Sequence, residues 1–287
     1  MKETFPSPAK INLRLDIVGR DAATGYHFLE MVLVPIDLAD QITVEETDHT
    51  EVVTENCAEH IPSEKNIVYR IVRAVETDIG RELPPLRISI RKETPTGAGM
   101  GGGSSNGAAV LDHIDRRFDL GLGLERKCAI ASRIGSDIPF FLHHSAAVVS
   151  GFGERVRPFR IAAFPFRLLL VHPGFPVDTK GAYALWDKKM LTKQRPVTTT
   201  IDRVFSLGSL TEWMDFIRND FEIPVFEEYP ALAVLRDRIA ACGAVRAFMT
   251  GSGSTMVGLF TDEERRESAF RRLSGEYGFV RKVGVLI

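Results

Sequence analysis

The chain has 287 residues, of which 44% are hydrophobic and 26% are charged, and its formal net charge is −2. This composition excludes a disordered, collagenous or coiled-coil protein, and the near-zero charge gives no electrostatic basis for binding nucleic acid or an anionic membrane. The three cysteines (Cys57, Cys128, Cys242) lie far apart, which argues against a disulfide framework or a structural zinc site. Because the chain shows neither a signal peptide nor a long apolar stretch, we expect a cytoplasmic protein of one or two domains.

Hydrophobic periodicity predicts a mixture of strands and helices in the first half of the chain. The residues from Ile11 to Ile17 alternate between apolar and polar, which predicts a half-buried strand. A helical pattern ends at Gly80, a residue suited to terminate a helix. The predicted strands are residues 11–17, 28–36, 41–45, 86–90 and 146–150, and the predicted helices are residues 67–79, 104–118 and 125–134.

The second half follows a tract at residues 151–165 that is rich in Gly, Pro and charged residues. We therefore predict a boundary near Val156, which divides the chain into domains at 1–155 and 156–287. The order of elements, with hairpin-like pairs, favours an α+β fold over a wound parallel sheet. The predicted strands are residues 166–172, 245–249, 256–260 and 279–286, and the predicted helices are residues 179–189, 210–219, 230–242 and 262–277.

The strongest local signal is a glycine-rich segment, in which five of the seven residues from Gly97 to Gly103 are glycine. It follows a predicted strand and precedes a helix rich in small residues that opens at Ser104. Glycines let consecutive N–H groups converge on an anion, and the positive end of the helix dipole adds to this attraction. The segment therefore predicts a loop that binds nucleotide phosphates, with a flexible surface loop as the alternative.

Two well-known phosphate loops fit this segment poorly. A Walker A loop needs a lysine after its second glycine, and no lysine occurs between Gly97 and Asp115. Gly97, Gly99 and Gly102 match the dinucleotide pattern, but four residues separate them from the preceding strand. Asp119 lies at a predicted helix end and not at the end of a second strand. Both a P-loop NTPase and a dehydrogenase are therefore disfavoured.

The segment at residues 95–106 resembles the phosphate-loop signature of the GHMP kinases, a family named for galactokinase, homoserine kinase, mevalonate kinase and phosphomevalonate kinase. Four other segments are similar to family motifs, and together they span the chain: residues 7–13, 25–27 with Glu30 just after, 137–141 and 250–255. The resemblance implies an α+β fold of two domains. The N-terminal domain would be like ribosomal protein S5 domain 2, the C-terminal domain would be ferredoxin-like, and the active site would lie in the interdomain cleft.

The three-glycine form of the loop points to a member that phosphorylates the 2-hydroxyl of 4-diphosphocytidyl-2-C-methyl-D-erythritol, in the non-mevalonate route to isopentenyl diphosphate. What the resemblance implies is ATP as the phosphoryl donor, with Mg²⁺ accompanying it. The partner would be this small cytidine diphosphate derivative, with no nucleic acid or membrane, and the protein would be a monomer or homodimer.

By resemblance, Asp137 is the catalytic base and Lys10 is the cation beside it. A tertiary alcohol is a poor nucleophile, so its phosphorylation needs a proton acceptor and neutralisation of the transferring group. The ATP-binding residues implied are Pro95, Thr96, Gly97, Ala98, Gly99, Met100, Gly101, Gly102, Gly103, Ser104 and Ser105. The substrate-binding residues implied are Asn12, Tyr26, His27, Asp137 and Thr179.

Each of these residues also has a purely structural interpretation. Asp137 could form a turn or cap, Lys10 could be a solvated charge of an edge strand, Asn12 could lie on a strand surface, and Thr179 could be a helix N-cap. The chain also departs from the family pattern, because its loop before Gly25 is longer and has no Asp before that glycine. The weakest part of the resemblance is residues 191–210. Another GHMP kinase that does not need Tyr26 and His27, a nucleotide-binding module without turnover and an RNA-binding protein remain as alternatives.

Overall fold

The computed structural model describes residues 2–57, 61–190 and 201–286 of the chain. These residues form two compact units, each built from several segments. Unit 1 comprises Met1–Ala9, Leu38–Thr96 and Gly101–His144, and unit 2 comprises Lys10–Asp37, Gly97–Met100 and Ser145–Ile287. Strands β1 (Lys2–Arg20) and β2 (His27–Glu46) contribute residues to both units. In the part of the chain that the structure describes, no helix has the length and apolar character needed to cross a bilayer.

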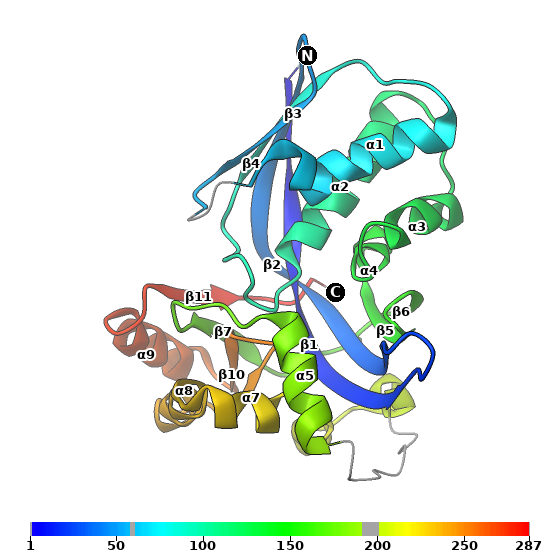
Figure 1. Cartoon of the computed structure of the whole chain (residues 1–287). Helices are drawn as coiled ribbons and strands as arrows, with labels where there is room; N and C mark the ends of the chain where they lie inside the picture. The colour runs from blue at the N-terminus through cyan, green and yellow to red at the C-terminus, as the bar shows by residue number, and fades with distance from the viewer. Residues whose placement is uncertain (1, 58–60, 191–200, 287) are drawn as a thin grey trace. The chain divides into compact units, whose positions relative to one another are not determined.

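Unit 1 contains a sheet in the order β3-β4-β2-β1, with β3 at Glu51–Glu55 and β4 at Leu86–Arg91. Strand β4 pairs antiparallel with β2 and parallel with β3. The helical elements lie on one side of these strands, and α1 and α2 run beside each other (Figure 1). They are η1 (Ser63–Lys65), α1 (Ile67–Ile79), α2 (Gly102–Arg117), α3 (Leu124–Ser132) and α4 (Ile138–Leu142).

Helix α1 forms where the apolar spacing of the sequence predicts a helix. Its apolar residues recur at helical spacing and are buried: Val68, Ile71, Val72 and Val75. The Asn66 side chain caps the helix by accepting the N–H of Val68 at 2.9 Å, and Gly80 ends it with φ +69°. Both the predicted bounds and the predicted stop are confirmed.

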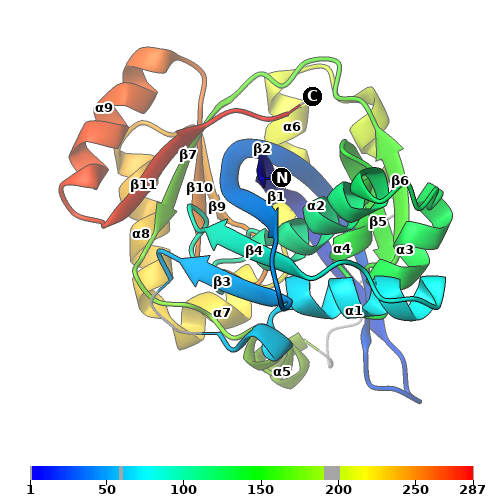
Figure 2. The same cartoon turned by 90° about the horizontal axis from the view of Figure 1, so that it is seen from above.

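In unit 2, part of β2 continues into a second set of strands. Strand β5 (Ala146–Gly151) pairs antiparallel with β2 and with β6 (Arg155–Phe159), while β8 (Arg218–Asn219) pairs parallel with β1. A separate antiparallel sheet has the order β11-β7-β10-β9, and α8 and α9 lie on one side of it (Figure 2). Its strands are β7 (Arg167–His172), β9 (Arg246–Met249), β10 (Met256–Phe260) and β11 (Phe279–Val283). The helical elements of unit 2 are α5 (Thr179–Met190), η2 (Ile201–Ser206), α6 (Leu210–Phe216), α7 (Glu222–Glu228), α8 (Pro230–Ala241) and α9 (Glu263–Ser274).

Strand β1 is buried on both faces, whereas the sequence predicted a half-buried strand. One face carries the apolar residues Ile11, Leu13, Leu15 and Ile17, and the other carries Lys10, Asn12, Arg14 and Asp16, all at most 7% exposed. The polar face is buried because its groups bond to one another and to neighbouring segments. The Arg14 guanidinium, for example, donates to the Asp16 carboxylate at 2.5 Å and to the Phe216 carbonyl at 3.0 Å.

Three other predictions about elements differ from the structure. The strands predicted at 28–36 and 41–45 are one continuous strand, β2, because Asp37 and Asp40 do not form a turn but accept backbone N–H groups from other segments. The helix predicted at 210–219 ends at Phe216, where the chain turns into β8. Val156 lies within β6 and pairs with Val149, so the tract at 151–165 contains a strand. The division at 155–156 stays a prediction, and residues 191–200 lie outside the described residues.

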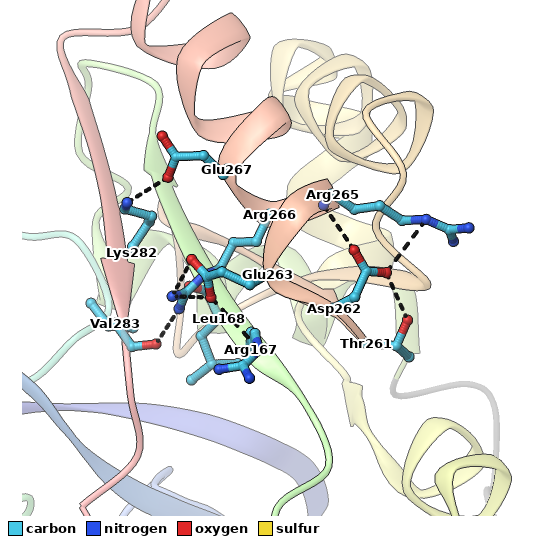
Figure 3. A network of polar contacts seen from close by, with 10 residues as sticks. All are labelled: Arg167, Leu168, Thr261, Asp262, Glu263, Arg265, Arg266, Glu267, Lys282 and Val283. Carbon is cyan, nitrogen blue, oxygen red and sulfur yellow. Dashed lines mark hydrogen bonds and ion pairs between the residues drawn. The ribbon is translucent and has the colours of Figure 1, made fainter.

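A polar network fastens α9 to the antiparallel sheet of unit 2 (Figure 3). The Arg266 guanidinium pairs with both carboxylate oxygens of Glu263, at 2.9 and 2.7 Å. It also donates to the carbonyl of Leu168 in β7 at 3.4 Å and to that of Val283 in β11 at 3.3 Å. Because its side chain is only 15% exposed, water replaces these bonds poorly.

We expect Arg266→Met to lower the free energy of unfolding by about 1–2 kcal/mol, because the apolar stem stays but two backbone carbonyls lose their donor. Urea denaturation monitored by circular dichroism measures this. Arg265→Met is the matched control, since Arg265 is 64% exposed and its ion pair is with Asp262, the N-cap residue of the same helix. Equal stability of the two variants would contradict the structural role of Arg266.

Candidate phosphate-binding and catalytic site

The glycine-rich segment joins β4 to α2 and uses glycine where the backbone requires it. Gly97, Gly99 and Gly101 have φ values of +68°, +75° and +68°, in the left-handed region that other residues avoid. Helix α2 begins at Gly102, two residues before the predicted start. The glycine content of this loop therefore reflects its backbone conformation, which a flexible linker would not need.

The N-terminus of α2 has the features of an anion site. Its N-cap residue is Gly101, and among the described residues no side chain makes a capping hydrogen bond there. The first N–H groups of a helix have no acceptor within the helix, and they form the positive end of its dipole. This 16-residue helix therefore presents backbone donors suited to phosphate oxygens.

Lys10 contacts the loop directly within unit 2. Its Nζ donates to the carbonyl of Gly99 at 2.9 Å and to Oδ1 of Asn12 at 2.6 Å, and its backbone N–H donates to the carbonyl of Met100 at 3.0 Å. The residue is 4% exposed, so it is not a solvated charge on an edge strand. The structure thus brings Lys10 to the glycine loop, with Asn12 bonded to Lys10.

A second glycine-rich turn, at residues 250–255, packs against the backbone of the loop at Gly99. A Cβ atom at Gly99 would stand 2.2 Å from the Thr250 carbonyl oxygen, so the two backbones touch with no space for a side chain. The Thr250 hydroxyl accepts the N–H of Asn12 at 2.9 Å. Thr179 joins the same turn through a hydrogen bond of 2.8 Å between its hydroxyl and that of Ser252.

Thr179 is the first residue of α5, but it is not the residue that caps it. The Asp178 carboxylate accepts the N–H of Gly181 at 2.7 Å and so takes the capping role. The structural interpretation of Thr179 as an N-cap is therefore wrong. Its hydroxyl is directed instead to the turn that supports the loop.

In unit 1, Ser105 anchors the first turn of α2 to β1. Its hydroxyl accepts a hydrogen bond from that of Ser7 at 2.7 Å and donates to the carbonyl of Pro8 at 2.6 Å. Ser105 is 2% exposed. Among the residues predicted to bind ATP, Ser105 thus has its side chain engaged in holding the helix in place.

Sequence reasoning missed a second lysine beside the loop. Lys92 follows β4, and its Nζ would stand 3.0 Å from a Cβ atom at Gly102. It forms an ion pair with the fully buried carboxylate of Asp40, which also accepts the N–H groups of Glu93 and Thr94 at 2.8 Å each. The sequence signal that could have revealed it is the position of Lys92 between β4 and Gly97, the first glycine of the loop. Lys92 therefore lies beside the first residue of α2 with its ammonium paired to Asp40.

Asp137 occupies the N-cap position of α4 in unit 1, with Pro139 in the first turn. Its backbone is already helical, with φ −83° and ψ −12°, and the side chain makes no capping hydrogen bond among the described residues. The side chain is half-buried. Capping therefore does not account for the carboxylate at this position.

His27 is held by an aromatic and acidic cluster in unit 2 that the sequence did not reveal. Its Nε2 lies 2.6 Å from Oδ1 of Asp187, and its ring stacks on Tyr183 with centroids 4.6 Å apart and planes inclined by 16°. Tyr183 and Asp187 are four residues apart on α5, so they share one face of that helix. Tyr26 is 68% exposed, and its ring lies edge-on to Phe152.

The longer loop before Tyr26 closes on itself. The N–H of Asp21 donates to the Tyr26 carbonyl, and the N–H of Gly25 donates to the Asp21 carbonyl, both at 2.8 Å. Arg20 donates through Nε to the Gly25 carbonyl at 3.0 Å, and its Nη1 lies 3.3 Å from Asp187. The departure from the family pattern therefore leaves an ordered turn that also supports the His27 cluster.

Comparisons with known proteins agree with these features. The family model "GHMP kinases N terminal domain" matches residues 66–145, and "GHMP kinases C terminal" matches residues 203–278. A protein of Geobacter metallireducens named 4-diphosphocytidyl-2-C-methyl-D-erythritol kinase is 35% identical over 94% of each chain. A protein of Nitratidesulfovibrio vulgaris with the same name is 36% identical over 95% of each chain.

Solved structures show the same relationship. A crystal structure of a 4-(cytidine 5'-diphospho)-2C-methyl-D-erythritol kinase covers 99% of this chain and 99% of its own, with a TM-score of 0.79 and 28% identity. The mevalonate kinase of Methanococcus jannaschii shares the fold, with a TM-score of 0.66 and 14% identity over 100% of this chain and 99% of its own. The chain belongs to the GHMP kinases.

Proposed function

We propose that the chain transfers a phosphoryl group from ATP to the 2-hydroxyl of 4-diphosphocytidyl-2-C-methyl-D-erythritol, giving the 2-phosphate and ADP, in the non-mevalonate route to isopentenyl diphosphate. Relatives that carry this activity in their names match nearly the whole chain at 35–36% identity. The observation that carries the proposal in the structure is the contact of the buried Lys10 ammonium with the Gly99 carbonyl. It places a fixed positive charge on the loop that suits phosphates.

The residues around the loop fit the triphosphate of ATP. The N-terminus of α2 has no side-chain cap, so its N–H groups are suited to the phosphate oxygens. Lys10 adds positive charge beside the Gly99 carbonyl. These groups would neutralise charge on the transferring phosphoryl group, which is the main contribution that proteins make to this chemistry.

Asp137 is the proposed acceptor of the hydroxyl proton. Its carboxylate does not cap α4, and the residue is half-buried, so the group is only partly solvated. Removal of the proton as the oxygen attacks phosphorus makes a tertiary alcohol a competent nucleophile. ATP supplies the phosphoryl group, and the protein supplies position, charge and a base.

Mg²⁺ is proposed from the chemistry of nucleotide phosphates. In the described residues, no group of three or more His, Cys, Asp or Glu side chains is arranged to hold a metal ion. Mg²⁺ usually keeps several waters and binds through substrate phosphates with one or two carboxylates. We therefore expect the ion to arrive with ATP, and turnover to stop when EDTA removes it.

The His27 cluster is proposed to recognise the cytosine base. The His27 ring stacks on Tyr183, and the Asp187 carboxylate holds the imidazole by its Nε2. The exposed ring of Tyr26 is available to stack on a base. In this proposal, cytidine recognition depends on Tyr26 and on residues of β2 and α5, separate from those of the phosphate loop.

We expect Asp187→Asn to raise KM for the cytidine substrate by about tenfold, the equivalent of ~1.4 kcal/mol, because the imidazole loses the carboxylate that fixes its orientation. KM for ATP should stay near its wild-type value. Steady-state kinetics with each substrate varied in turn makes the measurement. Asp178→Asn on the same helix is the control, since asparagine caps a helix as well as aspartate. Equal KM values for the two variants would contradict a role of Asp187 in substrate recognition.

The proposed function is tested with the purified chain, ATP, Mg²⁺ and three alcohols: the cytidine diphosphate derivative, mevalonate and homoserine. Release of ADP measures turnover, and phosphorus NMR identifies the phosphorylated hydroxyl. We expect turnover on the cytidine compound only. Turnover restricted to mevalonate or homoserine would make this chain another GHMP kinase. Binding of ATP without turnover of any alcohol would make it a nucleotide-binding module.

A further inference from the structure

The segment from Asn219 to Glu222 connects β8 to α7 and has no part in the site described above. Asn219 is 6% exposed, yet its side-chain amide is fully engaged. Its Nδ2 donates to the carbonyls of Met249 and Gly251, at 2.7 Å each, and its Oδ1 accepts the N–H of Phe221 at 3.0 Å. The buried side chain of Asn219 thus forms hydrogen bonds with the backbone of both residues that flank Thr250.

Two neighbours of Asn219, Asp220 and Glu222, also form hydrogen bonds with the backbone of adjacent segments. Glu222 accepts the N–H of Met249 through Oε1 at 2.8 Å. Asp220 accepts the N–H of Ile17 at 2.9 Å, and its own N–H donates to the carbonyl of Leu15 at 2.9 Å. The segment 219–222 therefore binds the end of β9 on one side and strand β1 on the other. We call these four residues the bracket.

The bracket contacts the phosphate loop through a single intervening turn at Thr250 and Gly251. A Cβ atom at Gly251 would stand 2.6 Å from the carbonyl oxygen of Gly99, so the backbone that Asn219 holds touches the loop itself. The adjacent residue, Thr250, bonds to Asn12, and Asn12 bonds to Lys10. A shift of the turn at Thr250 and Gly251 would therefore displace both the Gly99 carbonyl and the partner of Lys10.

We infer that Asn219 is a positioning residue for the nucleotide, which sets the Gly99 backbone and Lys10 by fixing the turn beneath them. The inference rests on the proposed function, because it assumes that this loop binds ATP. Asparagine suits the position chemically. It offers two donors to two carbonyls and one acceptor to an N–H, whereas an aspartate carboxylate would face both carbonyl oxygens with no donor.

The test is the affinity of the full chain for a non-hydrolysable ATP analogue with Mg²⁺, measured by titration calorimetry. We expect Asn219→Ala to raise Kd by about tenfold. Hydrogen exchange of the amides in residues 97–100 should become faster, because the loop opens more readily without its support.

Arg266→Met is the matched control. It also removes donors from two backbone carbonyls of unit 2, but those carbonyls belong to Leu168 and Val283 (Figure 3). It should lower Tm while leaving the Kd of the nucleotide analogue and the exchange of residues 97–100 at wild-type values. A role of Asn219 in stability alone would give the same pattern as this control, and that outcome would overturn the inference.

A second pair of variants keeps the inference testable if Asn219→Ala does not fold. Glu222→Gln retains an acceptor for the Met249 N–H, and Glu222→Ala removes it. We expect the alanine variant to weaken the nucleotide analogue and the glutamine variant to bind it like wild type. Equal affinity in both variants would count against the bracket. A wild-type chain that binds the analogue but phosphorylates no alcohol refutes only the proposed function, whereas failure to bind the analogue refutes both.

Discussion

Asp137→Asn is expected to lower kcat by about 10² or more, the scale of losing a general base, while the affinity for ATP stays close to wild type. The amide has the size of the carboxylate but cannot accept a proton from the hydroxyl. Because the Asp137 side chain makes no capping hydrogen bond to α4 among the described residues, the substitution should cost little stability. Single-turnover phosphotransfer, with nucleotide affinity measured separately, isolates the chemical step.

Asp78→Asn provides the control for this variant. Asp78 lies in the same unit at the end of α1 and pairs with Arg126, whose side chain is 52% exposed. Loss of such a surface pair changes stability by about 1 kcal/mol at most and should not alter turnover. If Asp137→Asn retains the kcat of Asp78→Asn, another group must accept the proton.

Gly99→Ala should abolish measurable nucleotide binding. Alanine at φ +75° is strained by about 1–2 kcal/mol, and its Cβ would stand 2.2 Å from the Thr250 carbonyl oxygen. Since the obstructing atom is backbone, either the loop or the turn must move. The Gly99 carbonyl would then leave the Lys10 ammonium. Titration with the ATP analogue, after circular dichroism has confirmed folding, measures the loss.

Gly121→Ala is the control that separates the backbone strain of a positive φ from the steric clash of the added Cβ. Gly121 has φ +63°, but a Cβ atom there meets nothing within 4 Å. It should therefore show the conformational cost alone, as a lower Tm with unchanged affinity for the analogue. If the two alanine variants bind the analogue equally well, close contact between the loop and the turn is not needed for nucleotide binding.

The sequence predicted best where one element satisfies its own requirements. Helix α1 was predicted to its residue limits because its apolar spacing, its cap and its terminating glycine are all local. The glycine loop was recognised for a similar reason, since its positive φ values restrict the residue type. Lys10 was assigned through the family resemblance; the structure shows its contact with Gly99, and its catalytic role stays a prediction.

The sequence failed where a residue's partner is distant along the chain. Asp40 lies just before the strand predicted at 41–45, and the sequence gives no sign that its carboxylate binds residues more than fifty positions away. Asp187 lies 160 residues from His27, and Asn219 grips a turn 30 residues further on. Such pairings leave no periodic pattern, so they become visible only when the fold brings the segments together.

The turn at residues 250–255 also bears on how the protein is made. The glycine loop is synthesised when about a third of the chain exists, but the backbone on which Gly99 rests comes some 150 residues later. Unit 1 is complete in sequence at His144, whereas unit 2 combines early strands with segments from the end of the chain. A nascent or truncated chain that stops before Thr250 therefore holds its loop without support, and nucleotide binding has to await the last part of translation.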